Sequence, residues 1–87
     1  MSTAGLEALA LRPGDRVRFQ RTAGGRWHEA TVVGLERDGS VSLRDGKGAA
    51  RAIVAGRLEV RTKGPRGASI WESVVERAAR IEQMPLW

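Results

Sequence analysis

The residue types that most often carry enzyme chemistry are scarce in this 87-residue chain, which has one histidine and no cysteine. A general base needs a second group to orient it, and His28 has no such partner near it in the sequence, so a packing or surface role is favoured. Asp15, Asp38 and Asp45 each adjoin a glycine in a turn sequence, where carboxylates cap backbone amides. The glycines match neither a phosphate-binding loop nor a dinucleotide fingerprint. The sequence therefore predicts no catalytic residue, no metal site and no cofactor.

Basic and aromatic side chains form the first pattern with a functional meaning. Residues 12–66 hold thirteen of the fifteen basic residues and six acidic ones, a net charge of +7, whereas each end of the chain carries −1. A basic body attracts polyanions, most commonly nucleic acid. Aromatic rings beside basic groups suit stacking on single-stranded nucleic acid, so Trp27 is either a stacking platform flanked by Arg26 and Arg18 or a side chain that closes the end of the barrel. The candidate face for nucleic acid or a protein partner comprises Arg16, Arg18, Arg26, Trp27, His28, Arg44, Lys47 and Arg51.

The second pattern is the run of the last five residues, Gln83-Met84-Pro85-Leu86-Trp87. Two large apolar side chains behind a proline need a surface that buries them. The proline stiffens the peptide and so lowers the ordering cost of binding. One interpretation is a recruitment peptide that binds a partner. The other is that Leu86 and Trp87 fold back over the open end of a small barrel.

Short strands separated by turns must position these residues. Val17 and Phe19 alternate with polar residues, which is typical of a half-buried strand. Asp38-Gly39 between two β-rich runs predicts a tight hairpin turn, and Gly34 predicts a bulge. The expected strands cover 16–20, 26–35, 40–44, 49–54 and 58–61. Five short strands favour a small barrel, because closure removes exposed edges.

An amphipathic helix is expected after the strands. Ser69 and Glu72 have the spacing of a capping box, and Pro85 ends the helix. An apolar stripe of Trp71, Val74, Val75, Ala78 and Ile81, with Ile70 at its edge, is expected to dock on the barrel or on a second copy of the chain. The predicted organisation is an N-terminal arm (1–11), a barrel (12–61), a linker (62–68), a helix (69–84) and a tail (85–87).

The pattern of 12–61 resembles SH3-like small barrels. Gly25-Arg26-Trp27, Ala30-Thr31-Val32 and the Asp45-Gly46 turn are similar to the Tudor group. Gly14–Arg18, Trp27, Val33-Gly34 and Ala55–Glu59 resemble the type II dihydrofolate reductases. The resemblance implies a mainly β protein, a five-stranded SH3-like barrel followed by one C-terminal helix. A Tudor aromatic cage would draw on Phe19, Trp27 and His28, with Leu43-Arg44-Asp45 where a second aromatic group often stands.

Reductase activity does not transfer from this resemblance. The reductases line their active pore with Val-Gln-Ile-Tyr, and the matching segment here is Ala50-Arg51-Ala52-Ile53, which lacks both the glutamine and the tyrosine. A reductase-like enzyme is therefore the least favoured of the three function classes. We expect a protein that is not an enzyme.

The tail resembles the peptide by which bacterial polymerases and repair factors bind the DNA sliding clamp. That resemblance implies that Gln83 hydrogen-bonds in a small subsite, that Met84 takes a loosely specified position, and that Leu86 and Trp87 fill an apolar pocket. The expected function is a replication or repair adaptor whose basic barrel contacts DNA or a protein and whose tail recruits it to the clamp. The alternative is a DNA- or RNA-binding barrel without a clamp role. The lack of cysteine and of a long apolar run favours a cytoplasmic protein without a membrane partner.

Overall fold

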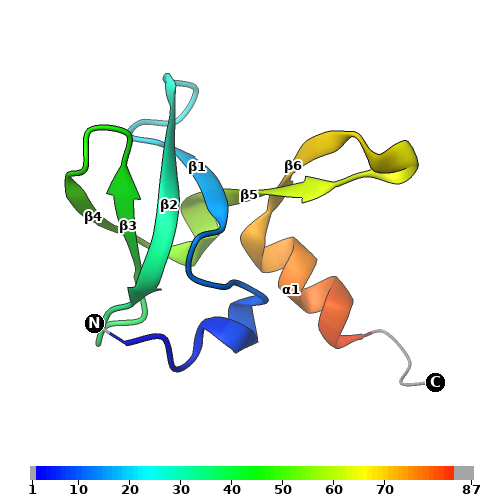
Figure 1. The fold of residues 1–87 in the computed structure, drawn as a ribbon, viewed down its shortest axis with the longest axis horizontal. Helices are drawn as coiled ribbons and strands as arrows, with labels where there is room; N and C mark the ends of the chain where they lie inside the picture. Colours follow the sequence, from blue (N-terminus) through cyan, green and yellow to red (C-terminus); the bar gives the residue numbers. More distant parts are fainter. Residues whose placement is uncertain (1, 84–87) are drawn as a thin grey trace.

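The computed structural model describes residues 2–83. Six antiparallel strands form one sheet in the order β4-β3-β2-β1-β5-β6, and one helix follows them (Figure 1). The strands are β1 (Arg16–Gln20), β2 (Trp27–Leu35), β3 (Val41–Asp45), β4 (Ala50–Ile53), β5 (Leu58–Lys63) and β6 (Ser69–Ser73). The helices are α1 (Val74–Glu82) and the short 3-10 helices η1 (Leu6–Leu9), η2 (Ala55–Arg57) and η3 (Pro65–Gly67).

The mainly β class with one C-terminal helix agrees with the prediction, and two details differ. The sheet has six strands rather than five. It is an open sheet with β4 and β6 as its edges, so the predicted closure into a barrel is not seen in the strand pairing.

The core lies on the inner face of the curved sheet. Strand alternation places Val17 and Phe19 of β1, and Ala30 and Val32 of β2, on this face, as their period of two predicts. The fully enclosed apolar side chains are Leu6, Leu11, Val17, Phe19, Ala30, Val32, Val41, Leu43, Leu58, Val60 and Val74. Four strands (β1, β2, β3 and β5), the N-terminal segment and α1 therefore share one core.

The turns follow the local chemistry of the sequence. In the β2–β3 hairpin, the Asp38 carboxylate accepts hydrogen bonds from the Ser40 amide and hydroxyl, and Gly39 has φ 90°, which only glycine adopts at no steric cost. These bonds lower the pKa of Asp38, the Ser40 hydroxyl contributing most. The strand register shifts between Val32 and Gly34, which confirms the predicted bulge.

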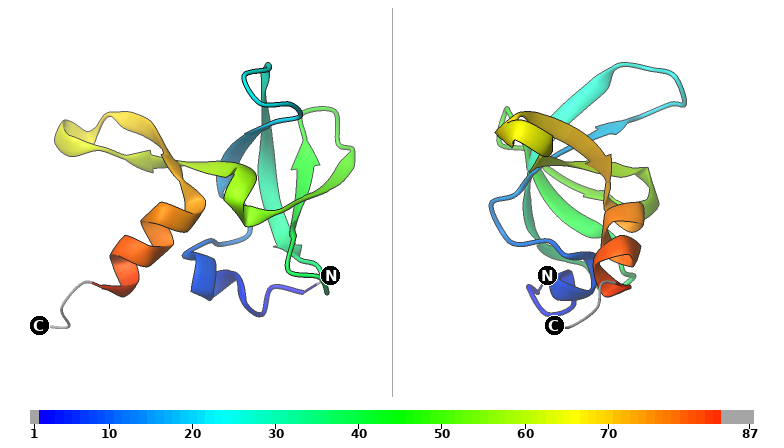
Figure 2. Two further views of the ribbon diagram at one scale, coloured as in Figure 1. Left: turned by 180° about the vertical axis from the view of Figure 1, so that it is seen from behind. Right: turned by 90° about the vertical axis from the view of Figure 1, so that its right-hand side faces the viewer.

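The N-terminal segment completes the core rather than lying loosely over it. Leu6 of η1 is 1% exposed, and Ser2 pairs with Leu35 at the end of β2. The Arg77 guanidinium of α1 donates to the Ala10 carbonyl oxygen at 2.9 Å. Figure 2 shows η1 and α1 at the same end of the sheet. The predicted N-terminal arm therefore contains a helical turn, Leu6–Leu9, that packs into the core.

The predicted helix from residue 69 is wrong in its first turn. Residues 69–73 form β6, which pairs with β5 over five positions and satisfies backbone groups that β5 would otherwise leave unpaired. The helix begins one turn later, where the Ser73 hydroxyl accepts from the Glu76 amide, because Ser73 and Glu76 repeat the capping-box spacing.

The later start of the helix also changes the predicted linker and the predicted apolar stripe. Residues 62–68 are the end of β5 and a hairpin turn, not a linker. Ile70 and Trp71 lie on β6, outside the helix. On α1 itself Val74 is fully buried, whereas Val75 and Ile81 are 46% and 41% exposed.

Candidate nucleic-acid interface

Five of the eight predicted interface residues line one hollow of about 420 Å³, which we call the basic hollow. They come from the β1–β2 loop, β2, the β3–β4 turn and β4, because these segments meet at one end of the sheet. The five are Arg26, Trp27, His28, Lys47 and Arg51, and they are joined there by Arg21, Glu29, Asp45 and Gly46. Four positive and two negative side chains thus share this hollow.

Asp45 organises the turn that presents Lys47. Its Oδ1 accepts from the Lys47 amide at 2.9 Å and from the Ala49 amide at 3.0 Å, and its Oδ2 accepts from Arg51 Nε at 3.2 Å. These contacts hold the pKa of Asp45 below its ordinary value, and the Ala49 amide contributes most. The prediction that aspartates in turns cap backbone amides is confirmed here and at Asp15, whose Oδ2 accepts from the Arg12 amide.

His28 belongs to the hollow by position but faces the core side of β2. It pairs with Phe19 across the strands, and the two rings stack with centroids 5.5 Å apart. This agrees with the packing role favoured from the sequence.

Trp27 and Arg18 form a second feature, a stack that the sequence did not predict. The Arg18 guanidinium carbon lies 4.0 Å from the centroid of the Trp27 ring and 4.8 Å from that of Trp71. Its Nε and Nη2 reach Glu59 Oε1 at 2.8 and 2.6 Å. One cation on β1 therefore joins Trp27 on β2 to Trp71 on β6.

The two residues missed in that stack are Glu59 and Trp71. The apolar stripe places Trp71 on the predicted helix, where its ring is expected to dock on the barrel or on a second copy of the chain. The signal that would have found it is the second capping-box spacing at Ser73 and Glu76, which leaves 69–73 free to pair as a strand.

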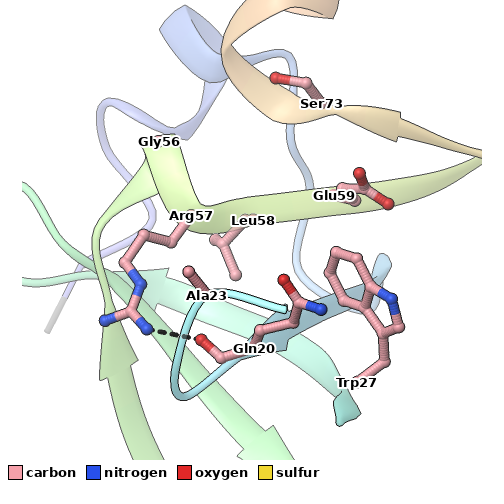
Figure 3. Close-up of a pocket in the computed structure, with 8 residues that line it drawn as sticks. All are labelled: Gln20, Ala23, Trp27, Gly56, Arg57, Leu58, Glu59 and Ser73. Atoms are coloured by element: carbon pink, nitrogen blue, oxygen red, sulfur yellow. Dashed lines mark hydrogen bonds between the residues drawn. The ribbon is translucent and has the colours of Figure 1, made fainter. Parts of the chain in front are cut away.

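Trp27 also lines a second pocket, of about 290 Å³ (Figure 3). Its lining includes Gln20, Trp27, Leu58, Glu59 and Ser73. An Arg57 Nη atom donates to the backbone oxygens of residues 20 and 21, which ties the β1–β2 loop to η2. Trp27 lines both this pocket and the basic hollow and is 39% exposed, so part of its ring remains accessible.

The remaining predicted interface residues lie outside the hollow. Arg16 pairs with Glu29 at 3.3 Å, both side chains being 53% exposed. Arg44 donates to the Gly48 carbonyl oxygen at 2.8 Å. Arg18 is held in the stack described above.

One of the four predicted clamp-binding residues, Gln83, lies within the described residues. Gln83 is exposed and directly follows the last residue of α1, whereas Met84, Leu86 and Trp87 lie outside the described residues. Within residues 2–83, no group of acidic or histidine side chains has the arrangement of a metal site. No helix in this range is long and apolar enough to cross a membrane.

Comparisons with protein-family models, with curated proteins and with solved structures gave no match to this chain.

Proposed function

We propose that this protein is a non-enzymatic module that binds nucleic acid through the basic hollow and Trp27. The observation that supports this most is the convergence on one hollow of Arg21, Arg26, Lys47 and Arg51 beside a partly exposed indole ring. Phosphate groups are attracted by such a cluster, and an exposed aromatic face stacks on bases of any sequence.

The fold supports an assignment to the SH3-like small barrels. Strands β1 to β5 are ordered β4-β3-β2-β1-β5, and the 3-10 helix η2 precedes β5 directly. The sheet curves around one apolar core, and an antiparallel ladder joins β1 to β5. This family assignment adds no function by itself, since many activities share the fold.

The charges of the hollow favour binding over catalysis. Asp45 is held by two backbone amides and Arg51, and Glu29 is paired with Arg16, so neither carboxylate is placed as a free base. His28 is stacked on Phe19. What the hollow offers a ligand is positive charge and one ring face.

A salt titration tests this function. Fluorescence anisotropy of a labelled single-stranded oligonucleotide should show an affinity that falls steeply with salt, by about 0.7 in log–log slope for each phosphate contact. The variant R26Q/K47Q removes two exposed charges of the hollow and should lower that slope by about one to two. The matched control R12Q/R37Q removes two charges away from it and should leave the slope nearly unchanged. Absence of binding by the native chain to any nucleic acid, or salt-independent binding, would reject the function.

A second proposed function is recruitment to the bacterial DNA sliding clamp, which would make the module a replication or repair adaptor. The observation that favours it is the position of Gln83, the first specified residue of the tail pattern, exposed at the end of α1. Gln83 lies outside the core, so its side chain is accessible to a partner.

Calorimetric titration of the clamp with the full chain tests this second function. Deletion of Met84–Trp87 should abolish binding and leave the thermal unfolding midpoint within a few degrees. A control chain carries residues 84–87 in a different order; loss of clamp binding in this control shows that binding depends on the order of these residues and not only on their composition. Equal affinity with and without the tail would reject recruitment, and a large drop in the midpoint would favour the fold-completing role instead.

A further inference from the structure

The hairpin of β5 and β6 extends beyond the rest of the sheet. Only these two strands pair in its outer part, where Arg61 lies opposite Trp71 and Lys63 opposite Ser69. In Figure 1 and in the left view of Figure 2, the β5–β6 hairpin extends away from the other strands. We call residues 61–71 the projecting hairpin.

The projecting hairpin carries only positive charge. Arg61, Lys63 and Arg66 lie on it, and no acidic residue occurs between Glu59 and Glu72. All three are exposed, and none takes part in an ion pair within residues 2–83. Arg61 and Lys63 are two positions apart on β5, and Arg61 lies opposite Trp71, so all three side chains lie on the same face of the sheet.

Several contacts make the projecting hairpin rigid. At its base, Trp71 packs on Arg18, which is itself paired with Glu59. At its tip, the Gly64 amide donates to the Ala68 carbonyl oxygen at 2.7 Å, and Ile70 packs so closely over Gly64 that a Cβ there would lie 3.0 Å from its Cγ2. A preformed ribbon loses little conformational entropy when it binds.

We propose that the projecting hairpin enters the major groove of B-form DNA. The inference rests on the phosphate-binding part of the proposed function and names a duplex as the substrate; stacking on Trp27 needs unpaired bases and plays no part in it. Two paired strands lie about 4.8 Å apart, and a major groove about 12 Å wide admits such a ribbon. The three steps along the strand from Arg61 to Gly64 span roughly 10 Å at about 3.3 Å each, close to a groove depth of about 8.5 Å. The narrow major groove of A-form RNA does not admit it.

The projecting hairpin and the basic hollow form one continuous surface. The paired residues Glu59 and Ser73 at the base of the hairpin line the same pocket as Trp27, and Trp27 lines the basic hollow. A duplex that receives the hairpin in its groove therefore places adjacent backbone phosphates beside the hollow.

Anisotropy titrations with a duplex and with one of its single strands test the inference. The variant K63Q/R66N removes two charges, and asparagine tolerates the left-handed backbone of Arg66, whose φ is 68°. Its duplex affinity should fall at least fivefold and its salt slope by about two, because each phosphate contact contributes about 0.9 to that slope. Its single-strand affinity should change less than twofold. The control R12Q/R37Q has the same net charge and should retain duplex affinity within twofold.

The two proposals fail in different ways. If the native chain binds duplex and the hairpin variant matches the control, the groove inference is overturned and the proposed function stands. If the native chain binds no nucleic acid, both are overturned. If the native chain instead binds vesicles containing phosphatidylserine, and the variant loses that binding, the surface is a lipid surface and the inference is overturned.

A crosslinking experiment keeps the inference testable if K63Q/R66N does not fold. The chain has no cysteine, so A68C places a single photoreactive label at the exposed turn of the hairpin. Illumination with the duplex should attach DNA to position 68, and the label at R37C in the β2–β3 turn should give little product. Equal yields from the two positions would overturn the groove inference.

Discussion

Removal of the cation from the Trp27–Arg18–Trp71 stack should destabilise the protein. The change R18M keeps an unbranched side chain and deletes the charge. Two cation–π contacts at a partly exposed site contribute about 0.5–1 kcal/mol each. The pair with Glu59 adds about 1 kcal/mol, since the two side chains are only 24% and 30% exposed and the contact is hydrogen-bonded.

The net expected loss is about 2 kcal/mol, because the methionine thioether recovers part of the contact with the rings. For a domain of this size that corresponds to roughly 8–16 °C in Tm. Urea unfolding followed by circular dichroism measures this loss in the free energy of unfolding. The matched control is R16M on the same strand and face, whose pair with Glu29 is 53% exposed on both sides, and it should cost less than about 0.5 kcal/mol.

A double-mutant cycle separates the stack from general effects of substitution. Combination of R18M with W71L should show a coupling of about 0.5–1 kcal/mol, because both changes remove the same contact. Additive effects, or a loss for R18M no greater than for R16M, would refute the view that this cation ties β6 to the rest of the sheet.

Three further changes test the fold and its pH dependence. S73A should lower the free energy of unfolding in urea by about 1 kcal/mol, because the helix cap is lost, whereas S69A should change it by less than about 0.5 kcal/mol. A larger loss for S69A than for S73A would indicate that the helix begins at Ser69. L6A should lower the free energy of unfolding by about 3 kcal/mol, because Leu6 is 1% exposed in the core. If L6A costs no more than L9A, the N-terminal segment is not part of the core. The lowered pKa of Asp45 means that its stabilising effect is complete above about pH 5 and is lost as the pH falls through about 4 toward the folded-state pKa. Unfolding at pH 3 and pH 6 should show a smaller difference for D45N than for the native chain, and equal differences would contradict this.

Much of the sheet was readable from the sequence because its signals are local. Alternation marked the inward faces of β1 and β2, Asp38-Gly39 marked the hairpin between β2 and β3, and Gly34 marked the bulge. Aspartate caps depend on neighbours two to four residues away, so Asp45 could be assigned without a fold.

The errors came where two local patterns competed. Ser69 and Ser73 each precede a glutamate at capping-box spacing, and nothing near them in sequence decides between them. Pairing with β5 decided between them. The edge of β5 pairs with residues 69–73, and the hairpin turn separates the two strands in the sequence. Strand pairing then satisfied backbone groups that a longer helix would have left exposed on β5.

The sequence by itself therefore determined the strand faces, the turns, the basic character of the body and the pattern of the tail, since each depends on neighbouring residues. Only the tertiary structure decided that Arg26, Lys47 and Arg51 share one hollow, that Arg18 lies between Trp27 and Trp71, and that residues 61–71 project as a charged ribbon. Those relations depend on strand order and register, which join residues up to fifty-three positions apart, from 18 to 71, and which no local spacing encodes.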